Sequence, residues 1–315
     1  MAPAAGSGGM RICYFIQNHL GPPQVCRLAR AIRRAQPEAF ILVGHDGFAG
    51  HCSADEVRQA LDVDVFAVRE PARRGYFSLL EPYFDAVEWL SGRGVSYDWI
   101  VYLSAQDYPT QPLQDFETLL ATSECDGFLR YWQACAPVNP WGRRRQGKCR
   151  YHYQYFDAPP WTSPALPVLR WCNRLQSRVH CHLVYGRRVG VRWEKPPFEP
   201  AYPCYAGSQW TTLRRSCAEY IAEQARGDHQ VVRWFRRTIC PDEAVIQTLL
   251  VNCGRFQLRN DDLRYADFTG STSGHPRLLT ARDLPVLTGG AYYFARKFDL
   301  AHDAGVLDLL DDRIG

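Results

Sequence analysis

The sequence predicts an α/β fold in which a mostly parallel, Rossmann-like sheet has helices on both faces. Short apolar runs alternate with longer amphipathic segments over residues 11–131, which is the pattern of parallel strands joined by crossover helices. One of these runs leads into the segment Ala105–Pro109, at a strand end where open α/β sheets place ligand-binding residues. With 315 residues, 46% hydrophobic and 22% charged, the chain can hold one large domain or two small ones, and we expect one.

The strands and helices of this first half follow each other in regular order. The predicted strands are short and apolar, at residues 12–16, 40–43, 63–68 and 98–104. The predicted helices are longer and amphipathic, one beginning at Gly21–Pro23, one at 53–61 and one at about 76–90. Ser53 is a suitable N-cap for the second helix, and Gly92 and Gly94 end the third.

The second half is less regular. Residues 132–200 lack a clear period and are dense in Pro, Trp, Tyr and Arg, which predicts a long functional or mobile segment rather than a plain connection. Regular signals return in an expected strand at 203–213 and in expected helices near 214–226 and 241–252. Residues 1–10 are expected to be disordered.

Composition argues against several classes of protein. The net charge of +4 is small for this length, so no nucleic-acid partner is expected. No apolar run approaches the length of a membrane span and the first residues lack the features of a signal peptide, which predicts a cytoplasmic protein. The 12 cysteines are then expected to be reduced thiols. Only three of the 37 basic residues are lysines, a skew typical of a GC-rich bacterial genome.

Four short motifs carry a family resemblance. They are Leu103–Pro109 (LSAQDYP), Ala206–Trp210 (AGSQW), Pro241–Glu243 (PDE) and Phe294–Asp299 (FARKFD). Each is weak alone, but together their order and spacing resemble the core-2/I-branching glycosyltransferases of family 14, which also include the peptide O-xylosyltransferases. The resemblance implies a GT-A-like fold, a UDP-sugar donor, inversion at the anomeric carbon and no metal cofactor. The expected donor sugar is GlcNAc, xylose, glucuronate or glucose, and the expected acceptor is a hydroxyl of a glycan or small metabolite.

This interpretation assigns a role to each part of a single catalytic domain at 11–315. Residues 11–131 form a nucleotide-binding half, 132–200 an aromatic insertion on the acceptor side, and 201–315 a catalytic and diphosphate-binding half. Aromatic rings of the insertion suit the C–H faces of a sugar acceptor. Animal branching enzymes carry an acidic acceptor-binding residue where this chain has Cys149–Tyr151, so a different acceptor is expected.

Inverting transfer requires a carboxylate that accepts the proton of the attacking hydroxyl, and the resemblance assigns that role to Glu243. If Pro241 is the first residue of a helix, Glu243 lies in its first turn, where free N–H groups favour an ionised carboxylate. The alternative is a helix cap, although Cys240 at the N-cap leaves a capping box incomplete. Asp242 is expected to start the helix or to orient substrate in the donor or acceptor pocket.

Basic side chains are expected to bind the diphosphate in place of a metal. The resemblance assigns this role to Arg277 and Lys297, while Arg296 is a second candidate that could equally form a surface charge pair. The triplet Asp62–Asp64 (DVD) has the form of a metal site. Its position between a helix and an alternating strand instead predicts two solvent-facing carboxylates.

The nucleoside is expected where the first two strands end. His45 and Asp46 resemble a His-x-Asp element that contacts uridine in the family, and Asn18 and His19 are their expected neighbours. Asp46-Gly47 is also a strong turn signal, so a structural role for Asp46 is equally open.

The remaining pocket candidates lie in two of the motifs. Asp107 could bond a donor hydroxyl or stabilise the turn before Pro109. Ser208, Gln209 and Trp210 follow Gly207, whose lack of a side chain permits close backbone approach. Trp210 could stack on a sugar or belong to the core.

Two other functions fit parts of the sequence. A dehydrogenase fits the Rossmann-like first half, but no Gly-x-Gly-x-x-Gly follows the first strand. A non-catalytic carbohydrate- or nucleotide-binding protein on the same fold is the second alternative, and it would bind its ligand without releasing UDP.

Overall fold

The computed structural model describes residues 9–142, 144–162, 164–165, 167, 170–171, 173, 178–192, 195–271 and 274–314. Most of the segment expected to be disordered, residues 1–8, lies outside this set. Within the described ranges, no helix combines the length and the apolar character needed to cross a membrane.

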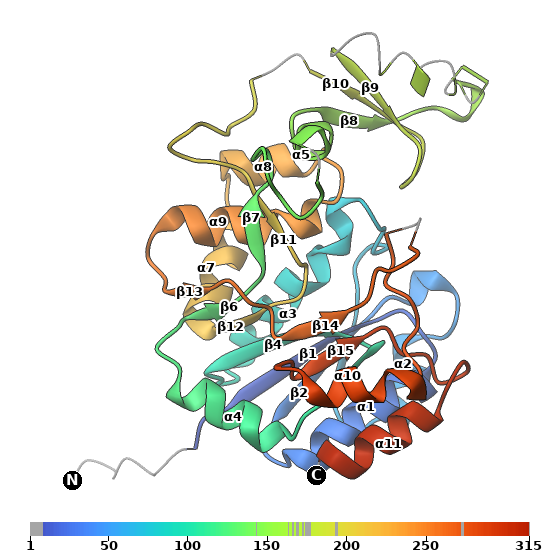
Figure 1. Ribbon diagram of the computed structural model, residues 1–315, viewed down its shortest axis with the longest axis vertical. Coiled ribbons are helices and arrows are strands. Elements are labelled where there is room, and N and C mark those ends of the chain that lie inside the picture. The colour runs from blue at the N-terminus through green and yellow to red at the C-terminus, as the bar shows by residue number, and fades with distance from the viewer. Residues whose placement is uncertain are drawn as a thin grey trace.

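A seven-stranded sheet forms the centre of the molecule (Figure 1). Its parallel strands are, in spatial order, β3 (Asp64–Ala67), β2 (Phe40–His45), β1 (Ile12–Asn18) and β4 (Trp99–Ser104). Beyond β4 the sheet continues with β12 (Thr212–Arg214), which is antiparallel to β4, then β6 (Gly127–Phe128) and β13 (Leu258–Arg259). The four parallel strands are those that the apolar runs of the first half predicted.

Helices cover both faces of this sheet. On one face lie α1 (Pro22–Ala35), α2 (Ala54–Ala60), α4 (Leu113–Thr122) and α11 (Gly305–Ile314). On the other face lie α3 (Glu81–Gly92), α7 (Arg215–Arg226), α8 (Gln230–Phe235) and α9 (Val245–Cys253). Because side chains alternate along a strand, β1 supplies Tyr14 and Ile16 to the first core and Phe15 to the second. The predicted α/β fold, a mostly parallel sheet with helices on both faces, is confirmed.

Two small sheets support the strand ends. In one, β5 (Asp107–Pro109) pairs with β15 (Phe294–Arg296), which pairs with β14 (Arg264–Ala266). In the other, β7 (Tyr131–Gln133) pairs with β11 (Tyr205–Gly207). The single strand expected at 203–213 is therefore two strands, β11 and β12, in different sheets, because the chain changes sheet between Gly207 and Thr212.

Residues 132–200 hold more regular structure than their sequence pattern predicts. After α5 (Arg144–Tyr151), the strands β8 (Gln154–Asp157), β9 (Val179–His182) and β10 (Arg188–Val191) form an antiparallel sheet at one end of the molecule (Figure 1). Each of these strands has four residues, which is too short for alternation to be evident among prolines and aromatic residues.

Two predicted helices begin later than expected. The helix expected from residue 76 starts at Glu81, after a 3-10 turn at Phe77–Leu79. The helix expected from residue 241 starts at Val245, because Pro241–Glu243 form a separate 3-10 turn. The prediction that Glu243 lies in the first turn of an α-helix is therefore wrong. The sequence patterns also did not predict α4 or α8.

Candidate active site

The predicted site residues gather where the central strands end. The parallel strands β1, β2 and β4 end at Asn18, His45 and Ser104, and the register places Asn18 beside His45. This edge is the ligand-binding edge of an open α/β sheet. The end of β15 and the turn Pro241–Glu243 bring residues of the second half to the same region, since the charges of Asp242 and Arg296 both act on Tyr102 of β4.

Asn18 and His45 are buried and bonded to each other. The Asn18 amide donates to His45 Nδ1 at 2.9 Å and to the Leu20 carbonyl at 3.0 Å. Because Nδ1 accepts this bond, Nε2 carries the ring proton and donates to the Cys52 carbonyl at 2.9 Å. Both nitrogens of His45 are thus used within the protein, where they hold the two strand ends together.

Asp46 organises the loop that follows β2. Its carboxylate accepts the backbone N–H groups of Phe48 at 3.0 Å and Ala72 at 2.9 Å, which ties this loop to the segment after β3. The structural role that the turn signal allowed is therefore present, and each oxygen retains a lone pair for a ribose hydroxyl. His19 lies nearby, where desolvation and the Lys297 charge lower its pKa.

Arg296 is a largely buried cation with two neighbours, its side chain 16% exposed. Its Nε lies 3.4 Å from Asp107 Oδ1, and its guanidinium lies 4.1 Å from the centroid of the Trp210 ring. The other Asp107 oxygen accepts the Ser104 backbone N–H at 2.6 Å, so Asp107 also serves the turn. Burial lowers the pKa of Arg296 and the Asp107 charge opposes this, so a surface charge pair is the wrong description of this position.

The segment Gly207–Trp210 packs closely against the protein interior. A Cβ atom on Gly207 would lie 1.7 Å from the Arg130 carbonyl oxygen, so the position requires glycine, as the sequence predicted. The Gln209 amide donates to the Tyr102 hydroxyl at 2.8 Å, and the Ser208 carbonyl accepts from Gln247 at 2.6 Å. Trp210 contacts Tyr102 edge-on at 5.0 Å and Arg296 through its face, so it joins the core to the cationic group.

Lys297 follows Arg296 and is half-buried. In the part of the chain that the structure describes, its ammonium group makes no hydrogen bond or ion pair. Burial lowers its pKa, as do the charges of Arg296 and Arg74, while Asp299 opposes them. A half-buried ammonium surrounded by other cations is a site for an anion.

Arg74 completes this cationic group. It comes from the segment after β3, where its guanidinium donates to the Gly274 carbonyl at 2.6 Å and to His275 Nε2. An acceptor at Nε2 requires a neutral His275 ring, in agreement with its pKa, which burial and the charges of Arg74 and Lys297 lower to about 4. Arg74 also stacks over Tyr185 at 5.0 Å, so its position is fixed from two sides.

Arg277 is held by carboxylates of its own neighbourhood. Its Nε donates to Asp267 at 2.6 Å, and its two terminal nitrogens donate to Asp283 at 2.5 and 3.0 Å. These bonds raise its pKa, Asp283 contributing most, and they neutralise its charge locally. A role for Arg277 on the diphosphate stays a prediction, and Arg277 would have to give up part of this arrangement to fulfil it.

Glu243 is fixed by an ion pair with the insertion. Its Oε2 accepts from Arg150 on α5, and the Arg150 guanidinium lies 4.7 Å from the Trp141 ring. Among the described residues, Oε1 has no partner, and the side chain retains 32% exposure. The glutamate is therefore fixed through one carboxylate oxygen, and its other oxygen is left without a partner among the described residues.

Asp242 is buried beside Glu243. Its residue is 5% exposed, and no described residue donates a hydrogen bond to its Oδ1. Burial and the Glu243 charge raise its pKa to about 7, although Arg150 and Arg74 oppose the shift. The Arg74 charge therefore acts on both Asp242 and Lys297, which places the carboxylate pair and the cationic group in one region.

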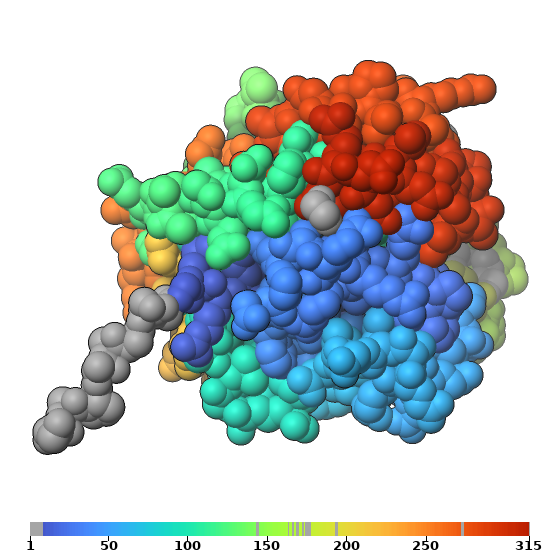
Figure 2. Space-filling view, turned by 90° about the horizontal axis from the view of Figure 1, so that it is seen from below, coloured from blue at the N-terminus to red at the C-terminus, as the bar shows by residue number. Residues whose placement is uncertain are grey.

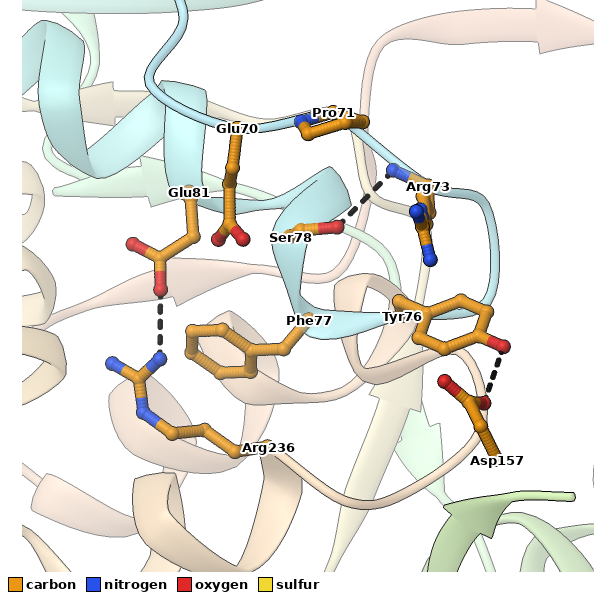
Figure 3. Close-up of a pocket in the computed structure, with 9 residues that line it drawn as sticks. All are labelled: Glu70, Pro71, Arg73, Tyr76, Phe77, Ser78, Glu81, Asp157 and Arg236. Atoms are coloured by element: carbon orange, nitrogen blue, oxygen red, sulfur yellow. Dashed lines mark hydrogen bonds and ion pairs between the residues drawn. The ribbon is translucent and has the colours of Figure 1, made fainter. Parts of the chain in front are cut away.

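A cavity of about 390 Å³ opens on the neighbouring surface (Figure 3). Two of its charged residues form an ion pair, in which Arg236 donates to Glu81 at 2.8 Å, and Asp157 accepts from the Tyr76 hydroxyl at 2.7 Å. Neither Glu243 nor Lys297 lines it. The chemistry of the predicted residues therefore lies outside this cavity.

Asp62 and Asp64 are exposed at the start of β3, as expected for solvent-facing carboxylates. Across the described ranges, no three His, Cys, Asp or Glu side chains come together in a way that could hold a metal ion. Whether the reaction needs a metal stays a prediction.

The burial of Asp242 predicts a pH-dependent stability. The folded protein retains the proton of Asp242 up to a pKa of about 7, whereas an unfolded chain loses it near 3.8. Stability due to this group is therefore present at low pH and is lost as pH rises between these values. As pH rises from 4 to 8, we expect the free energy of unfolding of Asp242→Asn to increase relative to that of the wild type by about 2 to 4 kcal/mol. Chemical unfolding of both proteins measures this difference. The exposed Asp228→Asn should show no such trend, and a constant difference for Asp242→Asn would contradict the prediction.

Fold and site together define an α/β protein with a carboxylate pair and a cationic group at the ends of its parallel strands. Comparison with known proteins agrees. Residues 174–286 match the family model of the core-2/I-branching enzymes. β-Glucuronosyltransferase GlcAT14A of Arabidopsis thaliana is 22% identical over 226 residues, which are 70% of this chain and 43% of that protein. The chain thus spans less than half the length of this curated relative.

Solved structures of S. aureus TarS also match. One covers 73% of this chain and 33% of TarS with a TM-score of 0.33 and 9% identity. Another, TarS 1–349 in complex with UDP-GlcNAc, covers 73% of this chain and 53% of that one with a TM-score of 0.32 and 8% identity. The family model and the curated relative agree with the resemblance that the four motifs carry: the chain is similar to the core-2/I-branching enzymes.

Sequence reasoning did not select two residues of this site. Arg74 lies in the loop after β3. The one sequence signal for it was the general rule that open α/β sheets bind ligands at the carboxyl ends of their strands. In the sequence, Arg150 is notable only because animal branching enzymes carry an acidic residue at this place. Its pairing with Glu243 joins positions 93 residues apart, and no local pattern reports such a contact.

Proposed function

We propose that this protein is an inverting glycosyltransferase that transfers a sugar from a UDP-sugar to a hydroxyl group without a metal ion. The observation that carries the proposal is the grouping of Glu243, which Arg150 fixes, and the buried Asp242 with the cation Arg74, whose charge also acts on the unpaired Lys297. An inverting reaction needs a base and an anion-stabilising group on opposite sides of the reacting carbon.

The cationic group is suited to the leaving diphosphate. As the bond between the anomeric carbon and the UDP oxygen breaks, negative charge grows on the diphosphate, and fixed cations lower the energy of that state. Lys297 provides an ammonium that no described residue neutralises, while Arg296 and Arg74 are held in place by ring stacking. These three residues are the proposed substitutes for a divalent ion.

Glu243 is suited to the role of base. Its bond to Arg150 fixes Oε2, and Oε1, which no described residue bonds, is available to receive the proton of the acceptor hydroxyl. In the proposed step the acceptor oxygen bonds to the anomeric carbon from the face opposite UDP, its proton passes to Glu243, and UDP leaves with the bonding electrons.

A panel of UDP-sugars tests this function. UDP-glucuronate is the first donor to test because the Arabidopsis relative is named a glucuronosyltransferase, and UDP-GlcNAc, UDP-xylose and UDP-glucose follow. We expect release of UDP from at least one donor, with an inverted anomeric configuration in the product by NMR. Binding of UDP without turnover of any donor would instead indicate a binding protein.

Metal independence is a separate expectation. Activity should be unchanged after dialysis against excess EDTA, because lysine and arginine side chains supply the positive charge. UDP release measured with and without EDTA checks it. Loss of activity that manganese restores would contradict it, and Asp62→Asn with Asp64→Asn would then show whether those carboxylates hold the ion.

A further inference from the structure

The insertion differs in charge from the rest of the chain. Residues 132–200 contain 12 lysines and arginines and three aspartates and glutamates, a net charge of +9, whereas the remainder carries −5. A small overall charge therefore conceals a strongly basic part. Such an asymmetry indicates an anionic partner.

Exposed apolar side chains are concentrated in the same part. Five of the nine large hydrophobic residues that are exposed in the described ranges fall within residues 132–200. Trp161 is 80% exposed, and Trp171 and Val184 are each 59% exposed. Tryptophan is rarely left this accessible on a surface that contacts water alone.

The register of the small sheet separates an inner from an outer face. Tyr155, His180 and Gly190 are opposite one another on the face where Tyr155 is buried and Arg188 bonds to the Gly75 and Thr238 carbonyls. The other face carries Phe156 and Val189, and Phe156 is 36% exposed. This outer face is apolar and only partly open, since Cys181 on it is buried and Arg237 stacks over Phe156 at 5.1 Å.

This sheet lies at the end of the molecule opposite α1 and α11 (Figure 1). Figure 2 views that opposite end, where the blue N-terminal region with α1, the green region with α4 and the red C-terminal region with α11 lie at the surface. Exposed basic residues also belong to the insertion, among them Arg145 and Lys148 on α5, and Arg170. We name Trp161, Trp171, Val184, Phe156 and these three basic residues the basic aromatic face.

We propose that the basic aromatic face docks on the surface of a lipid bilayer that contains anionic lipids. Tryptophan rings prefer the headgroup level of a membrane, and arginine and lysine side chains are attracted by the negative potential of anionic lipids. Docking of this kind needs no spanning helix. The net charge of +9 over residues 132–200 complements such a surface.

The apolar component distinguishes a bilayer from a soluble polyanion. A nucleic acid or an acidic polysaccharide would neutralise the basic side chains, but Val184 and the outer face of Phe156 would gain little from it. A bilayer interface accepts both kinds of group. Docking would also bring α5, whose Arg150 holds Glu243, close to the membrane. If the proposed transferase activity holds, acceptors at the bilayer surface would then meet the base directly.

Vesicle binding tests the proposal with the full chain. We expect sedimentation with vesicles of 30% phosphatidylglycerol in phosphatidylcholine, ~fivefold weaker binding for Arg170→Ala, and at least about 10-fold weaker binding for Trp161→Ala with Trp171→Ala. Binding should weaken at high salt. Leu309→Ala on α11 and Arg30→Ala on α1 are matched controls, exposed at the opposite end, and should bind like the wild type.

Three outcomes would overturn the proposal. They are absence of binding to anionic vesicles, equal binding to pure phosphatidylcholine, and displacement from anionic vesicles by single-stranded DNA at low concentration. Unfolding temperature and UDP affinity, measured for every variant, show that lost vesicle binding does not come from misfolding. Because vesicle binding needs no turnover, it can succeed or fail independently of the transferase function.

Discussion

Glu243→Gln is expected to lower kcat for sugar transfer by about 100- to 10,000-fold, the range typical of a lost general base. Glutamine has the shape of glutamate but accepts no proton at neutral pH. The affinity for UDP should stay unchanged, because Glu243 pairs with Arg150, which is not one of the cations proposed for the diphosphate. Single-turnover rates and calorimetric titration with UDP measure the two quantities separately.

Two comparisons make this result specific. Glu219→Gln removes an exposed carboxylate on α7 that pairs with Arg215 at 2.6 Å, and it should leave kcat unchanged. Asp242→Asn removes the neighbouring carboxylate and tests whether the base is the buried residue instead. A Glu243→Gln enzyme with wild-type kcat would exclude Glu243 as the base, and full loss in Asp242→Asn alone would assign the role to Asp242.

The central sheet was predictable because its signals are local and long enough. β1, β2 and β4 are buried runs of six or seven residues, and between them lie segments with one apolar face, such as α1. Buried strands of this length leave few alternatives to a parallel sheet covered on both faces.

Shorter elements were not predictable in the same way. The strands β8, β9 and β10 are each four residues long and acquire their order from pairing with one another. The turn at Pro241–Glu243 depends on Cys240, which adopts a positive φ of 49° that no local residue preference predicts. Tertiary contacts decide such positions, so a pattern based on propensity places the helix start too early.

The sequence indicated which residues belong to the candidate site better than it indicated how those residues bond to one another. Motifs identified Glu243, Asp107, Arg296 and Lys297, and strand ends identified Asn18 and His45. The sequence did not show that Asn18 and His45 form a hydrogen bond with each other, or that Arg277 forms ion pairs with two aspartates. Those facts depend on side-chain geometry across elements, and they decide which charges remain available to a ligand.

Lys297→Ala is expected to weaken UDP binding by about 10- to 100-fold, the effect of removing a charge-assisted hydrogen bond. Its ammonium group has no counter-ion among the described residues, and burial with Arg296 and Arg74 lowers its pKa. A bound diphosphate would relieve that repulsion, so the site gains more from the anion than an exposed lysine would. Titration with UDP measures the change.

Lys195 is the natural control, because it is an exposed lysine that already pairs with Glu199 at 3.5 Å. Lys195→Ala should bind UDP like the wild type. Arg277→Ala provides the sharper contrast: if its bonds to Asp267 and Asp283 persist in the complex, this variant should lose thermal stability and little UDP affinity. The reverse outcome, with Lys297→Ala unaffected and Arg277→Ala weakened, would move the diphosphate to Arg277. It would also require that arginine to exchange its carboxylates for phosphate oxygens when UDP binds.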